Sequence, residues 1–142
     1  MIDLIKVFEP VVMPLRPVKM ISHMGIDIHG AIWREGKIDL ELAAMYKFFE
    51  RINSVDAHLI STSQKEALKT LMNAKAEPKL LKVHNKDEFY EALEEMGTDA
   101  VVVDNEKPKS KRVALYIHPE DPRFRAFLQQ RIYAKEPLPQ IE

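Results

Sequence analysis

One pattern constrains the fold of this chain more than any other: short apolar segments alternate with longer amphipathic segments. Short apolar runs bounded by polar turns are typical of buried strands, and apolar residues recurring at helical spacing are typical of core-facing helices. This alternation predicts a parallel sheet with right-handed crossovers and helices on both faces, a three-layer, Rossmann-like α/β fold of about five strands. The predicted strands are 22–28, 56–60, 79–83, 99–104 and 113–117, and the predicted helices are 40–53, 64–74, 87–96 and 122–132.

The first 20 residues differ from this pattern because three prolines, Pro10, Pro14 and Pro17, interrupt them. Each proline removes a hydrogen-bond donor, so we expect an edge strand or an arm rather than a central strand. The segment is also rich in apolar residues, which predicts that it packs on the domain itself or on a second copy, giving a possible homo-oligomer. Residues 21–134 would then form the α/β domain, and 135–142 an extended tail.

The composition excludes several classes of protein. The 142 residues include 21 basic and 22 acidic side chains, a balance that argues against coating nucleic acid by bulk charge. The chain has no cysteine, so it forms neither disulfides nor thiolate metal sites. No apolar run approaches the roughly 20 residues of a membrane helix, and the N-terminus lacks the pattern of a secretory signal. We therefore expect a cytoplasmic protein without a membrane partner.

Polar side chains follow each predicted strand. In open parallel sheets, ligands bind beyond the carboxyl ends of the strands, so these side chains mark the expected site. Asp27 and Asp104 should lie close together at that edge, since they end two of the strands. The polar groups at the strand ends are 27–30, 61–63, 84–86, 104–106 and His118.

The types of these residues favour phosphate chemistry. Two carboxylates without a nearby thiol make an all-oxygen site that suits Mg²⁺. A metal ion there neutralises a phosphate and allows one carboxylate to attack it as a nucleophile. The hydroxyls and amides of 61–63, at the start of a helix, are suited to hold phosphate oxygens. Lys86 would offset the negative charge of the transition state.

This order of parts resembles the haloacid dehalogenase superfamily of phosphotransferases, over about residues 22–130. The segments that carry the resemblance are GIDIHGAIW at 25–33, HLISTS at 58–63 and NKDEFYEALEEMGTDAVVVDNE at 85–106. A predicted hairpin at 32–38, with its turn at Glu35-Gly36, is similar to the short flap of that family. The resemblance implies Asp27 as nucleophile, Ser61 as phosphate ligand, Lys86 as charge partner, and Asp27, Asp104 and Asn105 at a magnesium ion.

One residue departs from the family pattern. His29 stands where the phosphatases of the superfamily have a second aspartate, the general acid for the leaving group. Histidine can donate a proton at neutral pH, so it can substitute, or it can mark another reaction or a copy that binds without turnover. The gaps at 31–38 and 63–86 have no room for a cap domain. Capless relatives have open sites that accept large substrates, or they use a neighbouring subunit as a lid.

Simpler interpretations of the same residues stay open. Asp27 and the Asp104-Asn105 pair can be turn or capping residues, 61–63 a helix cap and Lys86 a surface lysine. His29, His84 and His118 all end strands, which leaves a transition-metal site as an alternative.

Three functions compete. The first is a Mg²⁺-dependent phosphomonoester hydrolase or phosphotransferase that acts on a small or macromolecular phosphorylated substrate. The second is a catalytically degenerate domain of the same fold with a role in binding or assembly. The third is an unrelated nuclease-like or receiver-like domain with an acidic metal pocket.

Overall fold

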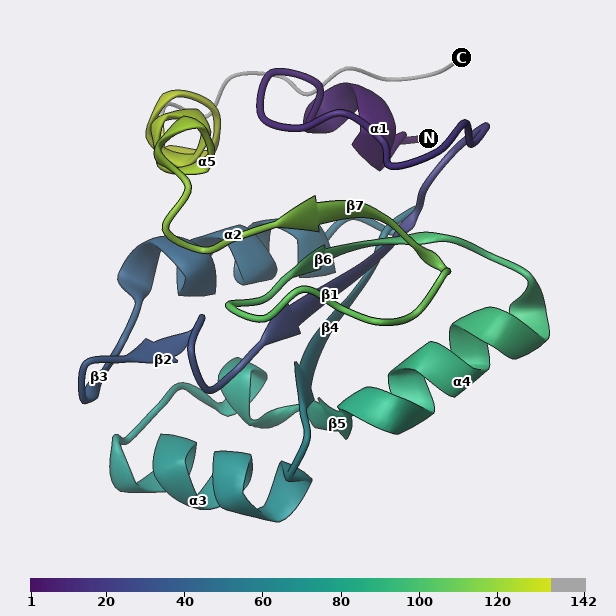
Figure 1. The fold of residues 1–142 in the computed structure, drawn as a ribbon. Coiled ribbons are helices and arrows are strands. Elements are labelled where there is room, and N and C mark those ends of the chain that lie inside the picture. Colours follow the sequence, from purple (N-terminus) through teal and green to yellow (C-terminus); the bar gives the residue numbers. More distant parts are fainter. Residues whose placement is uncertain (134–142) are drawn as a thin grey trace.

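The structure, a computed structural model, describes residues 1–133 and is built around a five-stranded sheet with strand order β5-β4-β1-β6-β7 (Figure 1). Every neighbouring pair of strands in it is parallel, which confirms the predicted α/β fold class. The strands are β1 (His23–Asp27), β4 (Asp56–Ser61), β5 (Val83–Asn85), β6 (Ala100–Val103) and β7 (Val113–Ile117).

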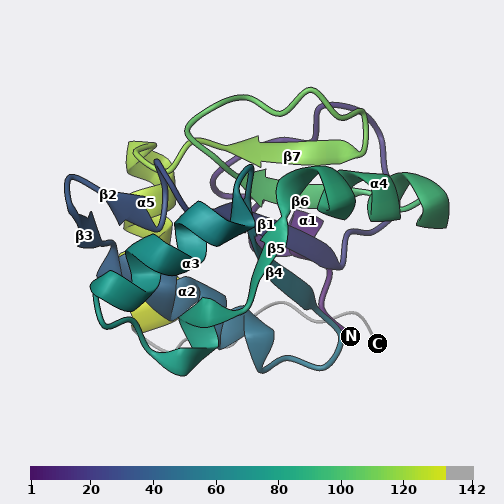
Figure 2. The same cartoon turned by 90° about the horizontal axis from the view of Figure 1, so that it is seen from below.

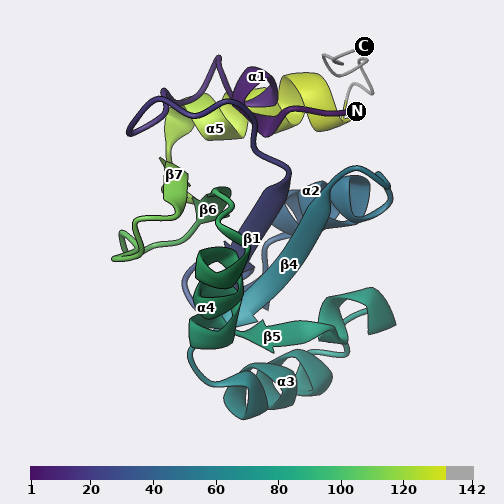
Figure 3. The ribbon, with the colours of Figure 1, turned by 90° about the vertical axis from the view of Figure 1, so that its right-hand side faces the viewer.

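Helices cover both faces of the sheet, so the domain has three layers. In Figure 3, α4 (Lys86–Met96) and α2 (Leu40–Glu50) lie on opposite sides of the central strands. The larger apolar core joins α2, α3 (Gln64–Asn73) and α5 (Pro122–Phe127) to one face, and a smaller cluster joins α4 to the other. Strand β6 is buried along its whole length because both clusters draw on its side chains.

Local sequence sets the ends of these helices. The side chains of Asp39, Ser63 and Asn85 cap α2, α3 and α4 by accepting hydrogen bonds from free amides of the first turns. Gly97 ends α4 with a φ of 64°, a left-handed conformation that favours glycine. The start of each helix is thereby fixed beside the carboxyl end of the strand before it.

The predicted hairpin is present. Strands β2 (Trp33–Arg34) and β3 (Lys37–Ile38) pair antiparallel, and the turn between them has φ values of 55° at Glu35 and 74° at Gly36. Two successive positive φ values are the mark of the tight turn that matches the twist of a two-stranded ribbon. This flap projects from the sheet next to α3 (Figure 2).

Three predicted elements differ in the structure. The predicted strand 79–83 is a 3₁₀ turn, Pro78–Leu81, followed by the short strand β5, because Pro78 at its start favours a helical turn. The predicted helix 122–132 ends as an α-helix at Phe127 and continues as a π-helical turn, Leu128–Tyr133. The predicted helix 40–53 ends at Glu50. The predicted tail, 135–142, lies outside the described residues.

The N-terminal segment is an arm and not an edge strand. It begins with a one-turn helix, α1 (Leu4–Val7), which the Asp3 carboxylate caps while also accepting from the amide of Ile21 at 3.2 Å. The Phe8 ring is fully buried, with its centroid 5.8 Å from that of Phe49 and 5.3 Å from that of Phe127. The arm therefore packs on its own domain, with α1 beside α5 (Figure 3).

We expect the Phe8→Leu substitution to destabilise the domain by about 1–2 kcal/mol, because the smaller side chain leaves part of an aromatic cluster unfilled. Urea unfolding measures this change. Met13→Leu is the control, since Met13 in the same arm is 80% exposed. Equal stability of the two variants would mean that the arm does not contribute to the core.

None of the helices in residues 1–133 combines the length and the apolar character that a membrane span requires.

Candidate active site

Two buried carboxylates meet at the carboxyl edge of the sheet. Asp27 is the last residue of β1, and Asp104 follows β6, the strand that pairs with β1. Their exposed fractions are 4% and 2%. The Lys86 ammonium, from the first residue of α4, lies 2.9 Å from Asp27 Oδ1 and 2.8 Å from Asp104 Oδ2. The structure therefore brings together three residues that lie far apart in the sequence.

Asn105 completes this cluster. In the amide orientation that satisfies its hydrogen bonds, the Asn105 nitrogen donates to Asp104 Oδ1 at 3.1 Å and to Asp27 Oδ2 at 3.2 Å, the two oxygens that Lys86 does not contact. Gly30 makes room for it, because a Cβ at that position would lie 2.3 Å from the Asn105 side chain. The φ of 100° at Gly30 also disfavours any other residue. Gly30 thus has a physical role in packing the site.

The charges of this cluster are strongly coupled. Burial and the neighbouring Asp104 charge raise the pKa of Asp27, Lys86 opposes both effects, and the net result is a pKa of about 7. Burial would lower the pKa of Lys86, but its contacts with Asp104 and Asp27 outweigh burial and raise it. A carboxyl that titrates near neutral pH beside a fixed ammonium is typical of functional sites.

Ser61 and His29 do not point into this cluster. The Ser61 hydroxyl is buried and donates to the Ser63 carbonyl at 3.1 Å, while it accepts from the Ser63 amide at 3.2 Å. The exposed His29 ring lies with Nε2 3.2 Å from Thr70 Oγ1 on α3. For Ser61 to bind phosphate and for His29 to donate a proton, as the sequence predicts, each side chain would have to leave these contacts.

Two tyrosines that sequence reasoning missed border the site. Tyr90 lies one helical turn after Lys86, and its buried hydroxyl has no hydrogen-bond partner in the described part of the chain. Burial, Asp104 and Asp27 all raise the pKa of Tyr90, so its hydroxyl stays protonated. Tyr116 donates to the Asp104 carbonyl at 2.9 Å. The four-residue spacing from Lys86 could have placed Tyr90 on the same helix face.

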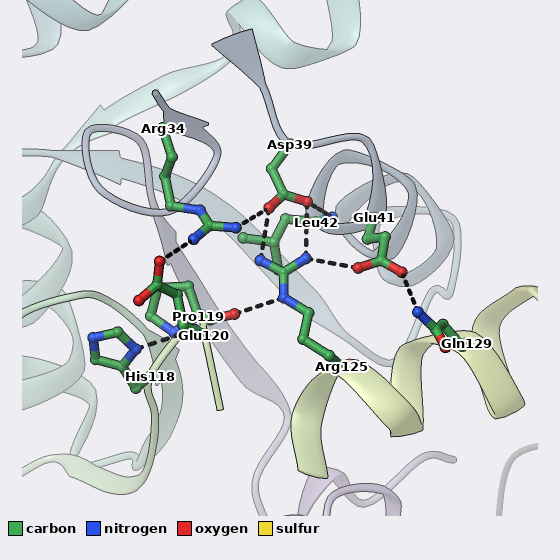
Figure 4. Close-up of polar contacts among 9 residues, drawn as sticks. All are labelled: Arg34, Asp39, Glu41, Leu42, His118, Pro119, Glu120, Arg125 and Gln129. Carbon is green, nitrogen blue, oxygen red and sulfur yellow. Dashed lines mark hydrogen bonds and ion pairs between the residues drawn. The ribbon is translucent and has the colours of Figure 1, made fainter. Parts of the chain in front are cut away.

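A network of ion pairs joins the flap to the start of α2, to the loop after β7 and, through Asp39, to α5 (Figure 4). Arg34 of the flap donates to Asp39 at 2.6 Å and to Glu120, in the loop after β7, at 2.7 Å. Arg125 of α5 donates to both oxygens of Asp39, at 3.0 and 2.6 Å. Burial would raise the pKa of Asp39, but the hydrogen bonds from Arg125 and Arg34 outweigh burial and hold the pKa at about 2. The base of the flap is therefore held by ion pairs whose charges are present throughout the ordinary pH range.

The carboxyl edge presents oxygen donors of the kind that Mg²⁺ takes, although no group of three or more His, Cys, Asp or Glu side chains gathers there or elsewhere in residues 1–133. Asp27 Oδ2 and Asp104 Oδ1 converge on one point, because the single amide nitrogen of Asn105 reaches both. Magnesium is commonly held by one or two carboxylates together with waters and substrate phosphate, so two converging carboxylate oxygens suffice. With its amide turned, Asn105 would offer its oxygen to the same ion.

The histidines of the transition-metal alternative are likewise not gathered into a group of three or more His, Cys, Asp or Glu side chains in residues 1–133. His58 and His84 stack edge-on at 5.0 Å between centroids, and burial together with the His84 neighbour lowers the pKa of His58. A neutral, ring-packed His58 is a structural residue of this sheet face.

Comparison of the chain with known protein families, with curated proteins and with solved structures finds no significant match.

Proposed function

We propose that this protein is a Mg²⁺-dependent phosphomonoester hydrolase, or a related phosphotransferase, in which Asp27 is the nucleophile. The observation that carries the proposal is the Lys86 ammonium held between the buried carboxylates of Asp27 and Asp104 at adjacent strand ends. When Asp27 is ionised, the lysine neutralises one of two negative charges, which leaves a site of net negative charge suited to a divalent cation. Bound there, Mg²⁺ would neutralise the phosphate and make attack by a carboxylate feasible.

The proposed hydrolysis takes place in two chemical steps. In the first, an Asp27 oxygen attacks phosphorus, the ester P–O bond breaks, and the alcohol oxygen leaves with the electron pair and accepts a proton. In the second, a water oxygen attacks the aspartyl phosphate, the bond to Asp27 breaks, and inorganic phosphate leaves. Lys86 holds the Asp27 carboxylate in position, and its charge stabilises the oxygens that gain negative charge.

His29 is the proposed proton donor for the leaving group. It lies two residues after Asp27 and is exposed, so it can reach a substrate once its ring leaves Thr70. In the second step the neutral imidazole accepts a proton from the attacking water. A catalytically degenerate binding domain is the second candidate, and the His29–Thr70 contact favours it because that contact holds the ring away from the carboxylates.

We expect the His29→Asp variant to retain or exceed the wild-type rate of aryl phosphate hydrolysis, with a changed pH profile. Only the imidazolium form of His29 can donate a proton, so the wild-type rate should fall on the alkaline side. Aspartate at this position should change the pH at which the rate falls on the alkaline side. Initial rates across a pH series, with Mg²⁺ and with a chelator, measure the effect.

The same assay separates the two candidates. A wild type that is inert towards many phosphomonoesters, together with an active His29→Asp variant, would establish the degenerate domain. Inactivity of both proteins and failure of both to bind Mg²⁺ would end the phosphotransfer proposal.

A further inference from the structure

A second feature of the molecule lies beside this site: a cleft of about 820 Å³ between the flap and α3. Figures 1 and 2 both show β2 and β3 next to this helix. One wall is apolar, with Trp33, Ile38 and the 76% exposed Leu40. The polar groups that line the cleft come from Lys37, Thr70 and Asn73.

The cleft is connected to the proposed reaction centre through the loop that follows Asp27. The Trp33 amide donates to the Ile28 carbonyl at 2.7 Å, which ties the indole-bearing strand to the residue after Asp27. Thr70, in the opposite wall, contacts the His29 ring at 3.2 Å. His29 therefore borders the cleft, and a substrate whose leaving group displaces the His29 ring from Thr70 would extend towards it.

The chemistry of the walls favours a flat nitrogen heterocycle. A partly buried indole lines the cleft, and stacking of bases on aromatic side chains is tolerant of base identity. The Asn73 amide carries both a donor and an acceptor for the edge of such a ring. Lys37 is exposed and has no ion-pair partner in residues 1–133, so its ammonium is available to a ligand oxygen. The volume is in the range of sites that hold small organic ligands, roughly 300–1,000 Å³.

We propose that this cleft binds the planar heterocycle of a nucleoside monophosphate, stacked on Trp33, while the phosphate lies at the carboxylates. The proposal rests on the proposed function only for the position of the phosphate. The base-binding part can be tested in a protein that does not turn over.

The test uses the fact that Trp33 is the only tryptophan in the chain. In the Asp27→Asn variant with Mg²⁺, adenosine 5′-monophosphate should quench the Trp33 fluorescence in a saturable way, and adenosine should do so more weakly. Ribose 5-phosphate has the same phosphate and sugar but no base, so it should bind without comparable quenching. Calorimetry on Leu40→Ala should show affinity for the nucleotide reduced severalfold, and Trp33→Ala should show it reduced about tenfold or more, with partial rescue in Trp33→Phe.

Met72→Ala is the matched control, because Met72 is a 63% exposed apolar residue of α3 that does not line the cleft. Equal affinity for the nucleotide and ribose 5-phosphate, or unchanged affinity in Leu40→Ala, would overturn the inference and leave phosphatase activity towards other esters intact. Base-dependent binding in a wild type that never releases phosphate would support the cleft and contradict the hydrolase.

Discussion

Replacement of Asp27 by asparagine should abolish phosphomonoester hydrolysis, with a rate loss of roughly 10³-fold or more, because an amide is a far poorer nucleophile than a carboxylate. The loss should also occur in the His29→Asp background. Wild-type kcat/KM should rise with pH as the buried Asp27 carboxyl ionises, and saturating Mg²⁺ should move this rise to lower pH because the cation stabilises the carboxylate. Residual activity of Asp27→Asn above one-tenth of the wild type would exclude Asp27 as nucleophile.

The same substitution should make the protein more stable at alkaline pH. Burial raises the Asp27 pKa from 3.8 to about 7, so the folded state binds a proton more readily than the unfolded state between these values. Stability therefore falls as pH rises through this window, by at most about 4 kcal/mol from this group. In metal-free buffer, Asp27→Asn should gain about 1–4 kcal/mol at pH ~8 and little at pH ~4. Urea unfolding at the two pH values measures the difference.

The Lys86→Met substitution should destabilise the protein by about 3–5 kcal/mol at neutral to alkaline pH, because it leaves two buried carboxylates without their cation. The effect should be smaller in acid, where a protonated Asp27 no longer repels Asp104. Lys82→Met is the control, since Lys82 is exposed. Denaturant unfolding in the presence of a chelator measures the change without any contribution from bound metal.

A double variant separates lost charge from lost packing. Lys86→Met combined with Asp27→Asn keeps the methionine but removes one of the two carboxylates, so much of the lost stability should return. Wild-type stability of Lys86→Met, or a double variant as unstable as the single one, would contradict an electrostatic role for this lysine.

Those parts of the fold that depend on local pattern could be predicted from the sequence. The short apolar runs predicted the strands, their alternation with amphipathic segments predicted a parallel α/β sheet, and Glu35-Gly36 predicted the flap turn. The rule that ligands bind at the carboxyl ends of parallel strands then placed Asp27 and Asp104 at one edge.

Other parts depend on contacts between distant segments and could not be predicted in this way. The three prolines of the N-terminal segment are compatible with either an edge strand or an arm. The packing of Phe8 against Phe49 and Phe127 decides between the two. The His29 orientation depends on Thr70, and the Asp39 network needs Arg125 from the other end of the chain. Contacts of this kind produce no repeating pattern in the sequence, because each joins residues that only the folded chain brings together.

The central claim, that Asp27 attacks phosphate, is tested most directly by mass spectrometry of the protein quenched in acid during turnover of an aryl phosphate with Mg²⁺. We expect a phosphoryl group on the peptide that contains Asp27, absent when the metal is chelated and absent in Asp27→Asn. Turnover without a phosphoryl group on this peptide, or a phosphoryl group on another residue, would contradict the claim.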